Sequence, residues 1–372
     1  MKTSFLPDFT MGKNSLIKLT QYVPKYSKVG LVYGKRAFQA SLPYLESLLH
    51  NKDILVVLSM HYGGECTDEN IKVVAKASKD ADVDYLIAVG GGKCIDTVKC
   101  AGDALSVPVI TVPTIASTCA AVTKISIVYD DHKAFKEVRT LSKPPIHCFI
   151  QPEIIVKAPK KYIWAGIGDT MAKHIESSFS ARNDDLNYCT ELGIKISENC
   201  YYPVIRDDVQ ALMDIEKGNI TQSVENVIQN IIITTGCVSL LVDPQYNSAL
   251  SHALFYGLTI REEVEKKHLH GEIVSYGTLV QLMMDQQNRL FKDTFLFHKA
   301  IGLPTSLEDL DILPSSNLED VLIKTEVNSE LEHVPYRVTK EKIQSAIYEV
   351  ERYNREFNEK NSNYSYKSGI SK

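Results

Sequence analysis

A glycine-rich run in the first half of the chain has the composition of a phosphate-binding turn. The run, Gly90-Gly91-Gly92-Lys93, directly follows the apolar residues 85–89. This order is typical of a strand that turns through glycines into a helix. Glycines let backbone N–H groups approach an anion closely, and the helix start adds the positive end of its dipole. The run therefore favours a nucleotide cofactor, although an ordinary tight turn has the same pattern.

A second group of chemically capable residues lies in the second half of the chain: one carboxylate and two imidazoles. Asp169 follows Gly166-Ile167-Gly168 at the expected start of a helix, where an Asp also serves as an N-cap. His252 lies in a largely apolar helical segment, and His270 begins another. Each residue alone is more often structural. Together they match a catalytic zinc with an open fourth position, or equally a two-His-one-carboxylate iron site.

The elements that must position these residues differ between the two halves of the chain. In the first half, short β-rich runs at residues 29–33, 54–58, 85–89 and 107–112 alternate with helical stretches such as 40–49 and 70–77, and further β-like runs follow at 125–129 and 148–150. This alternation predicts βαβ units and a mainly parallel sheet, that is, an α/β fold.

From about residue 158 onward the pattern becomes helical. Residues 169–182, 224–241 and 271–289 carry apolar side chains at helical spacing. We therefore expect an α/β dinucleotide-binding domain over residues 1–158 and an all-helical metal-binding and substrate domain over residues 159–372. The polar tail from about residue 355 is expected to be loosely ordered.

Composition narrows the partners and the compartment. The chain has 372 residues, of which 44% are hydrophobic and 23% charged, with a formal net charge of −5. It has no general basic surface for nucleic acid, and no apolar run of the about 20 residues that span a bilayer. Eight cysteines without a CxxC pair, and a first segment without an apolar signal core, favour reduced thiols in a cytoplasmic protein.

Five motifs in a fixed order resemble the glycerol dehydrogenase branch of the iron-containing alcohol dehydrogenase superfamily, over roughly residues 5–290. These motifs are Gly90-Gly91-Gly92-Lys93 with Asp96, the run Val112-Pro113-Thr114-Ile115-Ala116-Ser117-Thr118, Gly168-Asp169, Ser251-His252-Ala253 and His270-Gly271-Glu272. The resemblance implies a dehydroquinate synthase-like architecture in which a divalent metal lies between a dinucleotide-binding domain and a helical domain. By position, Asp169, His252 and His270 match the metal ligands of that family.

The resemblance also assigns a set of cofactor-contact positions. They are Gly91, Gly92, Lys93, Asp96, Thr114, Ser117, Thr123, Ile125 and Tyr129. In the iron-using branch a His follows the Asp ligand by four residues, whereas Lys173 stands here. With three ligands the zinc-type pattern fits better, so we expect Zn²⁺, with Fe²⁺ or another divalent metal as the alternative. A functional role for Lys173 or His174 is one interpretation. The commoner explanation is that both residues lie on a solvated helix face.

Two departures from the resembling family concern the cofactor and the substrate. The acidic residue after the first strand, which binds the adenosine ribose in many NAD-using relatives, is absent, and the chain reads Gly34-Lys35-Arg36. These charges favour NADP(H), or tolerance of it, unless they only cover a helix start. In the substrate loop Cys119 replaces the Asp of glycerol dehydrogenases, and Lys124 follows a few residues on. Without the negative charge of that Asp, the binding of an anionic substrate becomes less unfavourable, and Lys124 could attract one.

These observations predict a metal-dependent, NAD(P)-dependent oxidoreductase that interconverts a hydroxyl and a carbonyl group on a small polar substrate. The alternative is a 2-hydroxycarboxylate dehydrogenase that reduces 2-oxo acids with NADP(H). Minor alternatives are a dehydroquinate synthase-like lyase, for which the chain lacks a clear basic cluster, and a catalytically silent scaffold. We expect a homo-oligomer that binds a small molecule, with neither a nucleic acid nor a membrane as a partner.

Overall fold

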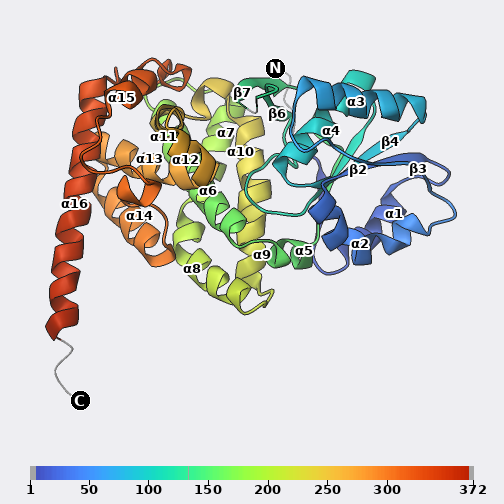
Figure 1. The fold of residues 1–372 in the computed structure, drawn as a ribbon, viewed down its shortest axis with the longest axis horizontal. Coiled ribbons are helices and arrows are strands. Elements are labelled where there is room, and N and C mark those ends of the chain that lie inside the picture. The colour runs from blue at the N-terminus through green and yellow to red at the C-terminus, as the bar shows by residue number, and fades with distance from the viewer. Residues whose placement is uncertain (1–5, 133, 368–372) are drawn as a thin grey trace. The chain divides into compact units, whose positions relative to one another are not determined.

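The chain forms two compact units, each built from two separate stretches of sequence. The computed structural model describes residues 6–132 and 134–367. Unit 1 consists of Met1–Gly166 and Gln210–Leu241, and unit 2 of Ile167–Val209 and Val242–Lys372 (Figure 1). The sequence analysis instead places one boundary near residue 158 and assigns all later residues to the second domain.

The reason for the difference is a close helix contact within unit 1. At Gly236 an added Cβ atom would lie 2.2 Å from Cγ2 of Val122, so only glycine allows this helix to approach the loop after residue 116. Helical spacing in a sequence predicts that a segment is helical, but it does not show which neighbours the helix packs against. Residues 210–241 are therefore helical, as predicted, yet belong to the unit that carries the sheet.

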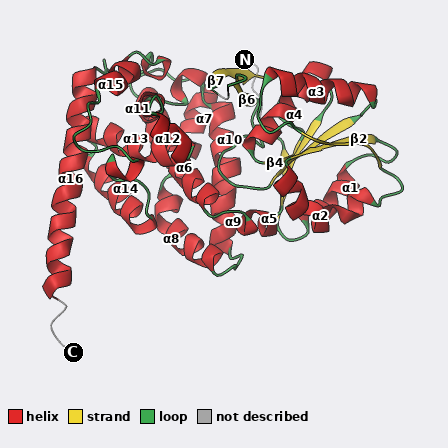
Figure 2. Cartoon of the chain, viewed as in Figure 1, coloured by secondary structure: helices red, strands yellow, loops and turns green. Residues whose placement is uncertain are grey.

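A six-stranded parallel sheet is the centre of unit 1 (Figure 2). Its spatial order is β1 (Asp8–Met11), β8 (His147–Ile150), β5 (Val109–Pro113), β4 (Tyr85–Gly90), β2 (Lys28–Tyr33) and β3 (Leu55–His61), with every neighbouring pair parallel. The predicted α/β fold with a mainly parallel sheet is confirmed. Strand β1 was not predicted, because four residues in a short N-terminal segment give little pattern.

A separate antiparallel hairpin follows the loop that contains Cys119. It pairs β6 (Ile125–Tyr129) with β7 (Phe135–Thr140). Residues 125–129 were predicted as β-structure, but β7 is polar and half exposed, so its sequence carries no apolar signal.

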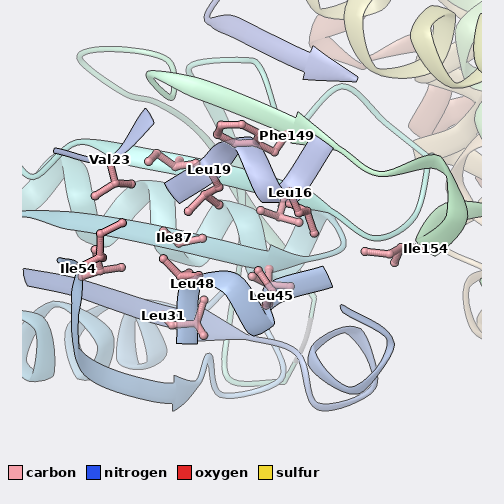
Figure 3. Packing of buried hydrophobic residues seen from close by; sticks show 14 residues of the cluster. Leu16, Leu19, Val23, Leu31, Leu45, Leu48, Ile54, Ile87, Phe149 and Ile154 are labelled. Carbon is pink, nitrogen blue, oxygen red and sulfur yellow. The ribbon is translucent and has the colours of Figure 1, made fainter. Parts of the chain in front are cut away.

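Helices cover both faces of the parallel sheet, with α1 and α2 on one side and α3 and α4 on the other (Figure 1). The helices of this part are α1 (Leu19–Tyr22), α2 (Lys35–Leu49), α3 (Asp68–Asp80), α4 (Gly92–Leu105) and α5 (Pro152–Lys157). Because a parallel sheet is covered on both faces, its strands read as continuous apolar runs. The core on one face is a cluster that includes Leu31, Leu45, Leu48, Ile87 and Phe149, all buried (Figure 3).

Over the part of unit 2 that the structure describes, the regular elements are helices. The helices after the sheet are α6 (Lys161–Ser180), α7 (Tyr188–Ser197), α8 (Tyr202–Glu216), α11 (Leu250–Leu258), α12 (Glu262–Lys267), α13 (His270–Met284), α14 (Asn288–Ile301), α15 (Glu319–Glu326) and α16 (Lys340–Lys367). Helices α6 and α8 each contain a unit boundary. Residues 355–367, predicted as a loosely ordered tail, continue α16. One reason is that Phe357 packs edge-on against Phe295 at a ring distance of 5.3 Å.

The remaining helical segment, α9 (Gln222–Gln229) to α10 (Thr235–Leu241), contains a π-helical turn at Asn230–Thr234. By length and composition alone, the 20 residues Gln222–Leu241 pass a test for a membrane-spanning helix, with a mean hydropathy of 1.3. No such run is expected from the sequence, because Glu225 and several uncharged polar residues interrupt the apolar positions. In the structure 56% of this apolar stretch is buried within the protein, as expected for a core helix.

A buried histidine on α14 predicts how stability depends on pH. Burial lowers the pKa of His298 to about 4, and its Nδ1 lies 3.2 Å from the main-chain oxygen of Pro304. The unfolded chain takes up a proton at His298 below about pH 6.5, whereas the folded protein does not until about pH 4. Stability should therefore fall through this window, by about 2 to 3 kcal/mol from this residue.

The variant His298→Asn removes the titrating ring, so its unfolding free energy should lose less on acidification than that of the unaltered protein. Urea unfolding at pH 7 and pH 4.5 measures the difference. The exposed His50→Asn serves as the control and should behave like the unaltered protein. An identical acid loss in His298→Asn would contradict the assignment.

Candidate functional site

Two glycines bring three helices of unit 2 close enough for their side chains to meet. At Gly168 on α6 an added Cβ atom would lie 2.5 Å from the main-chain oxygen of Gly271 on α13. At Gly277 on α13 it would lie 2.6 Å from the main-chain oxygen of Ser251 on α11. Each contact includes a residue next to a predicted metal ligand in the sequence. Gly168 precedes Asp169, Gly271 follows His270, and Ser251 precedes His252. The predicted helix start at Asp169 is wrong, because α6 begins at Lys161 and the glycines before Asp169 serve this close packing.

The three predicted ligands meet at this point. Asp169 Oδ1 lies 3.7 Å from Nε2 of His252 and 3.5 Å from Nε2 of His270, and one ligand atom from each residue lies within 4.8 Å of the others. Tetrahedral zinc with bonds of about 2.0 to 2.1 Å requires ligand atoms about 3.3 Å apart. The donor set and its spacing therefore fit a divalent metal with three protein ligands.

The charges around this metal-ligand cluster act against the effect of burial. Burial alone would raise the pKa of Asp169, but the hydrogen bond and charge of His270, together with the charges of His252 and Lys173, hold it at about 2. Burial would lower the pKa of His252, but the charge and hydrogen bond of Glu176 and the charge of Asp169 raise it to about 9. Asp169 is therefore an anion at neutral pH, as a metal ligand must be.

Glu176, which the sequence analysis missed, orients His252. It is fully buried on α6, and its Oε2 lies 2.5 Å from Nδ1 of His252. A metal ion at Nε2 would take the place of the second ring proton, while the proton on Nδ1 keeps its hydrogen bond to Glu176. The seven-residue spacing from Asp169 to Glu176 is about two helical turns and was a usable signal, because it places both carboxylates on one helix face.

The same side chain caps the helix that carries His252. The N-cap of α11, Ala249, offers no side-chain hydrogen bond. Instead, Oε1 of Glu176 accepts the N–H groups of Ala249 at 2.8 Å and His252 at 2.9 Å. Gln281 on α13 accepts the Ser251 N–H at 3.2 Å and donates to the main-chain oxygen of Ile175 on α6 at 3.2 Å. Glu176 and Gln281 thus tie the three ligand-bearing helices together.

His268 lies beside the cluster but is not one of its three ligands. Its Nδ1 is 2.9 Å from Glu272, and its Nε2 is 3.3 Å from Asp311. Both ring nitrogens of His268 therefore have carboxylate partners within the chain.

The predicted phosphate-binding turn lies in unit 1 and has the expected local structure. Strand β4 ends at Gly90, Gly91 is the N-cap of α4, and Gly92 begins that helix. At Gly91 an added Cβ atom would lie 2.8 Å from Ile115, so a side chain there would collide with the loop after β5. The Thr114 N–H donates to the Gly90 oxygen at 3.0 Å and joins the two turns.

Lys93 and Asp96, two predicted cofactor contacts, have partners within the chain. Lys93 Nζ lies 2.5 Å from Oε2 of the buried Glu65 and 4.9 Å from the ring centre of Tyr129. Asp96 is buried, accepts the Ile127 N–H at 3.1 Å and pairs with Lys99 at 2.9 Å. Asp96 therefore anchors the hairpin that carries Tyr129 and does not present a free carboxylate.

The remaining predicted cofactor positions surround these anchors. Ser117 lies in the loop after β5, Thr123 is buried just before β6, and Ile125 and Tyr129 begin and end β6. The main-chain oxygens of Thr123 and Ile125 accept from Lys99 at 3.2 and 2.5 Å. Lys99, which the sequence analysis did not select, therefore holds this loop in place.

Basic side chains gather at the carboxyl ends of β2 and β3. Gly34 is the N-cap of α2, and the exposed Lys35 and Arg36 follow in its first turn, which has no acidic residue. Positive charges oppose the dipole at a helix N-terminus, so an anion there would be stabilising. His61 ends β3 beside Tyr33, and burial together with the charge of Lys35 lowers its pKa.

The two predicted substrate residues also lie in unit 1. Cys119 is partly buried, and its Sγ lies 3.8 Å from Oγ of Ser239 on α10. Lys124 is partly exposed just before β6. The predicted substrate and cofactor residues thus lie in unit 1, and the metal-ligand cluster lies in unit 2.

Comparisons with known proteins extend this picture. Residues 7–152 match the family model "Iron-containing alcohol dehydrogenase". The chain is 33% identical to Hydroxycarboxylate dehydrogenase A of Escherichia coli strain K12, over 88% of this chain and 90% of that protein. It is 30% identical to a glycerol dehydrogenase of Thermotoga maritima, over 79% of this chain and 81% of that protein.

Solved structures of glycerol dehydrogenases have a similar fold. A probable glycerol dehydrogenase from Sinorhizobium meliloti 1021 aligns with a TM-score of 0.83 and 26% identity, covering 96% of this chain and 100% of that chain. Glycerol dehydrogenase from Schizosaccharomyces pombe shares the fold with a TM-score of 0.87, 24% identity and coverage of 97% and 93%.

Fold, ligand cluster and similarities together define a metal-dependent, nicotinamide-linked oxidoreductase of the glycerol dehydrogenase type. The chain belongs to the iron-containing alcohol dehydrogenase family. The resemblance read from the five motifs, the fold and the enzyme class are thereby confirmed.

The role of Glu176 predicts a split between two substitutions. Glu176→Gln can still accept the two backbone N–H groups, but its NH₂ group would donate to Nδ1 of His252 and move the ring proton to Nε2. Zinc affinity should therefore fall about 10- to 100-fold while the thermal midpoint changes little. Glu176→Ala should lower both, because α11 also loses its cap. Competition with a chromophoric chelator measures the affinity, and unaltered zinc binding by Glu176→Gln would refute this role.

Proposed function

We propose that the chain transfers a hydride between a nicotinamide cofactor and a small polar alcohol or carbonyl compound, with Zn²⁺ bound by Asp169, His252 and His270. The observation that carries the proposal is the cluster itself, in which one oxygen and two nitrogens from three helices lie within 4.8 Å of one another. A divalent ion bound there supplies a Lewis acid that polarises a hydroxyl or carbonyl oxygen.

The chain's own residues orient and hold the reacting groups. Glu176 fixes the ring proton of His252 on Nδ1, and its contacts with Ala249 and His252 prevent α11 from shifting. In unit 1, Glu65 holds Lys93 against Tyr129, and Asp96 and Lys99 hold the adjoining hairpin. We assign the nicotinamide cofactor to the turn at Gly91 and Gly92, where helix α4 begins.

A second candidate is reduction of a small 2-oxo acid to a 2-hydroxy acid. The observation that favours this candidate is Cys119. It is a poor hydrogen-bond acceptor, and it stands at the position that matches an Asp of glycerol dehydrogenases. The relative Hydroxycarboxylate dehydrogenase A supports the same candidate by its name. Formation of a homo-oligomer and a cytoplasmic location also stay predictions from the sequence.

Metal removal tests the proposal. Dialysis against a chelator should abolish reduction of both dihydroxyacetone and 2-oxobutanoate, and added Zn²⁺ should restore it. Asp169→Asn should lower kcat/KM at least about 100-fold in the zinc-supplemented protein, because the anionic ligand is lost. NAD(P)H absorbance follows the reaction and mass spectrometry the metal content. Full activity without bound metal would exclude the proposal.

We also propose that the enzyme prefers NADP(H), through Lys35, Arg36 and the adjacent His61. The double variant Lys35→Ala/Arg36→Ala should lower kcat/KM for NADPH about 10- to 100-fold and leave NADH nearly unchanged, because only NADPH carries a 2′-phosphate. Lys52→Ala, an exposed lysine before the amino end of β3, is the matched control. A strong preference of the unaltered enzyme for NADH would reject the idea.

A further inference from the structure

Lys173 lies where it can act on a ligand of the metal-ligand cluster. It follows Asp169 by four residues on α6, so both side chains lie on one helix face about 6 Å apart along the axis. Its charge lowers the pKa of Asp169 and counteracts the upward pKa shift of His252. Lys173 is partly buried, so it does not belong to a fully solvated helix face.

The Lys173 ammonium group has hydrogen-bonding capacity to spare. Its Nζ donates to the main-chain oxygen of Asn247 at 3.2 Å, which uses one of its three protons. Among the residues that the structure describes, Asp169 pairs with His252 and His270 and not with Lys173. A partly buried ammonium group with unused donors and no direct ion pair among the described residues indicates that a ligand with acceptor atoms completes this part of the site.

The charge balance identifies the sign of that ligand. Asp169 and Glu176 contribute two negative charges, and Lys173 contributes one positive charge. A bound divalent metal would bring the group to about +1, which favours an anion over a neutral molecule.

We infer that the Lys173 ammonium binds the carboxylate of the substrate and thereby selects small 2-oxo acids and 2-hydroxy acids over neutral polyols. This inference rests on the proposed function and names the substrate class of the same site. A 2-oxo acid carries its carboxylate on the carbon next to its carbonyl group. With that carbonyl at the metal-ligand cluster, the carboxylate lies within reach of a lysine one helical turn along α6.

The reaction balances without a further reactant. Reduction adds one hydride to C2 of the 2-oxo acid and one proton to the carbonyl oxygen, and the nicotinamide cofactor supplies the hydride when bound. The product is a 2-hydroxy acid. The carboxylate does not react, so Lys173 is a specificity-determining residue whose ammonium group holds one end of the substrate.

A pair of substrates that differ at the carboxylate tests the inference. In the zinc-loaded enzyme, Lys173→Met should lower kcat/KM for 2-oxobutanoate about 10- to 100-fold, since it removes a charge-assisted hydrogen bond. For 1-hydroxy-2-butanone, in which CH₂OH replaces the carboxylate, the change should stay below about 3-fold. Lys173→Arg should retain most of the preference. Lys195→Met, an exposed lysine on α7, is the control.

A binding measurement adds a readout that does not depend on turnover. Oxamate, a carboxylate that cannot be reduced, should bind to Lys173→Met at least about 10-fold more weakly by calorimetry, with zinc affinity unchanged. Equal losses on both substrates, or unchanged oxamate binding, would overturn the role of Lys173. If the unaltered enzyme reduces 1-hydroxy-2-butanone but not 2-oxobutanoate, the inference alone fails. If it reduces neither, the proposed function fails as well.

Discussion

The approach of α6, α11 and α13 at two glycines is the constraint on which the site depends. Gly168 and Gly277 let main-chain atoms of neighbouring helices come closer than any side chain would allow. Asp169, His252 and His270 are then brought within ligand distance of one another. Close packing alone does not orient a ring, however, and Glu176 and Gln281 supply the orientation by capping α11 from the other two helices. A buried carboxylate thus serves the helix and the ligand at once.

Unit 1 uses a comparable device for the cofactor loop. The buried pair of Asp96 and Lys99 joins α4 to the start of the β6–β7 hairpin through main-chain groups. Because a buried ion pair is costly when one partner is lost, both residues are needed to keep the loop in place. One of the residues that match cofactor contacts, Asp96, thus also holds the adjoining hairpin in place.

The sequence predicted the parts of this structure that depend on local pattern. Continuous apolar runs revealed the parallel strands, and helical spacing revealed the helices of unit 2. The three ligands required the ordered motifs, because each of them alone has an ordinary structural explanation. The sequence could not show that Gly168 lies within a helix, since a glycine before an Asp also suits a helix start. Nor could it show that residues 210–241 join unit 1, or that Lys173 forms no direct ion pair within residues 6–132 and 134–367, because both depend on contacts between segments far apart in the chain.

The central claim is that Asp169, His252 and His270 bind one divalent metal ion. Anomalous X-ray diffraction at the zinc edge, from crystals of the zinc-loaded protein, tests it most directly. We expect a single strong peak at about 2.0 to 2.2 Å from Asp169 Oδ1 and from Nε2 of both histidines. A zinc peak elsewhere in the chain, or a loaded protein in which any of these three atoms lies outside bonding distance of the metal, would contradict it.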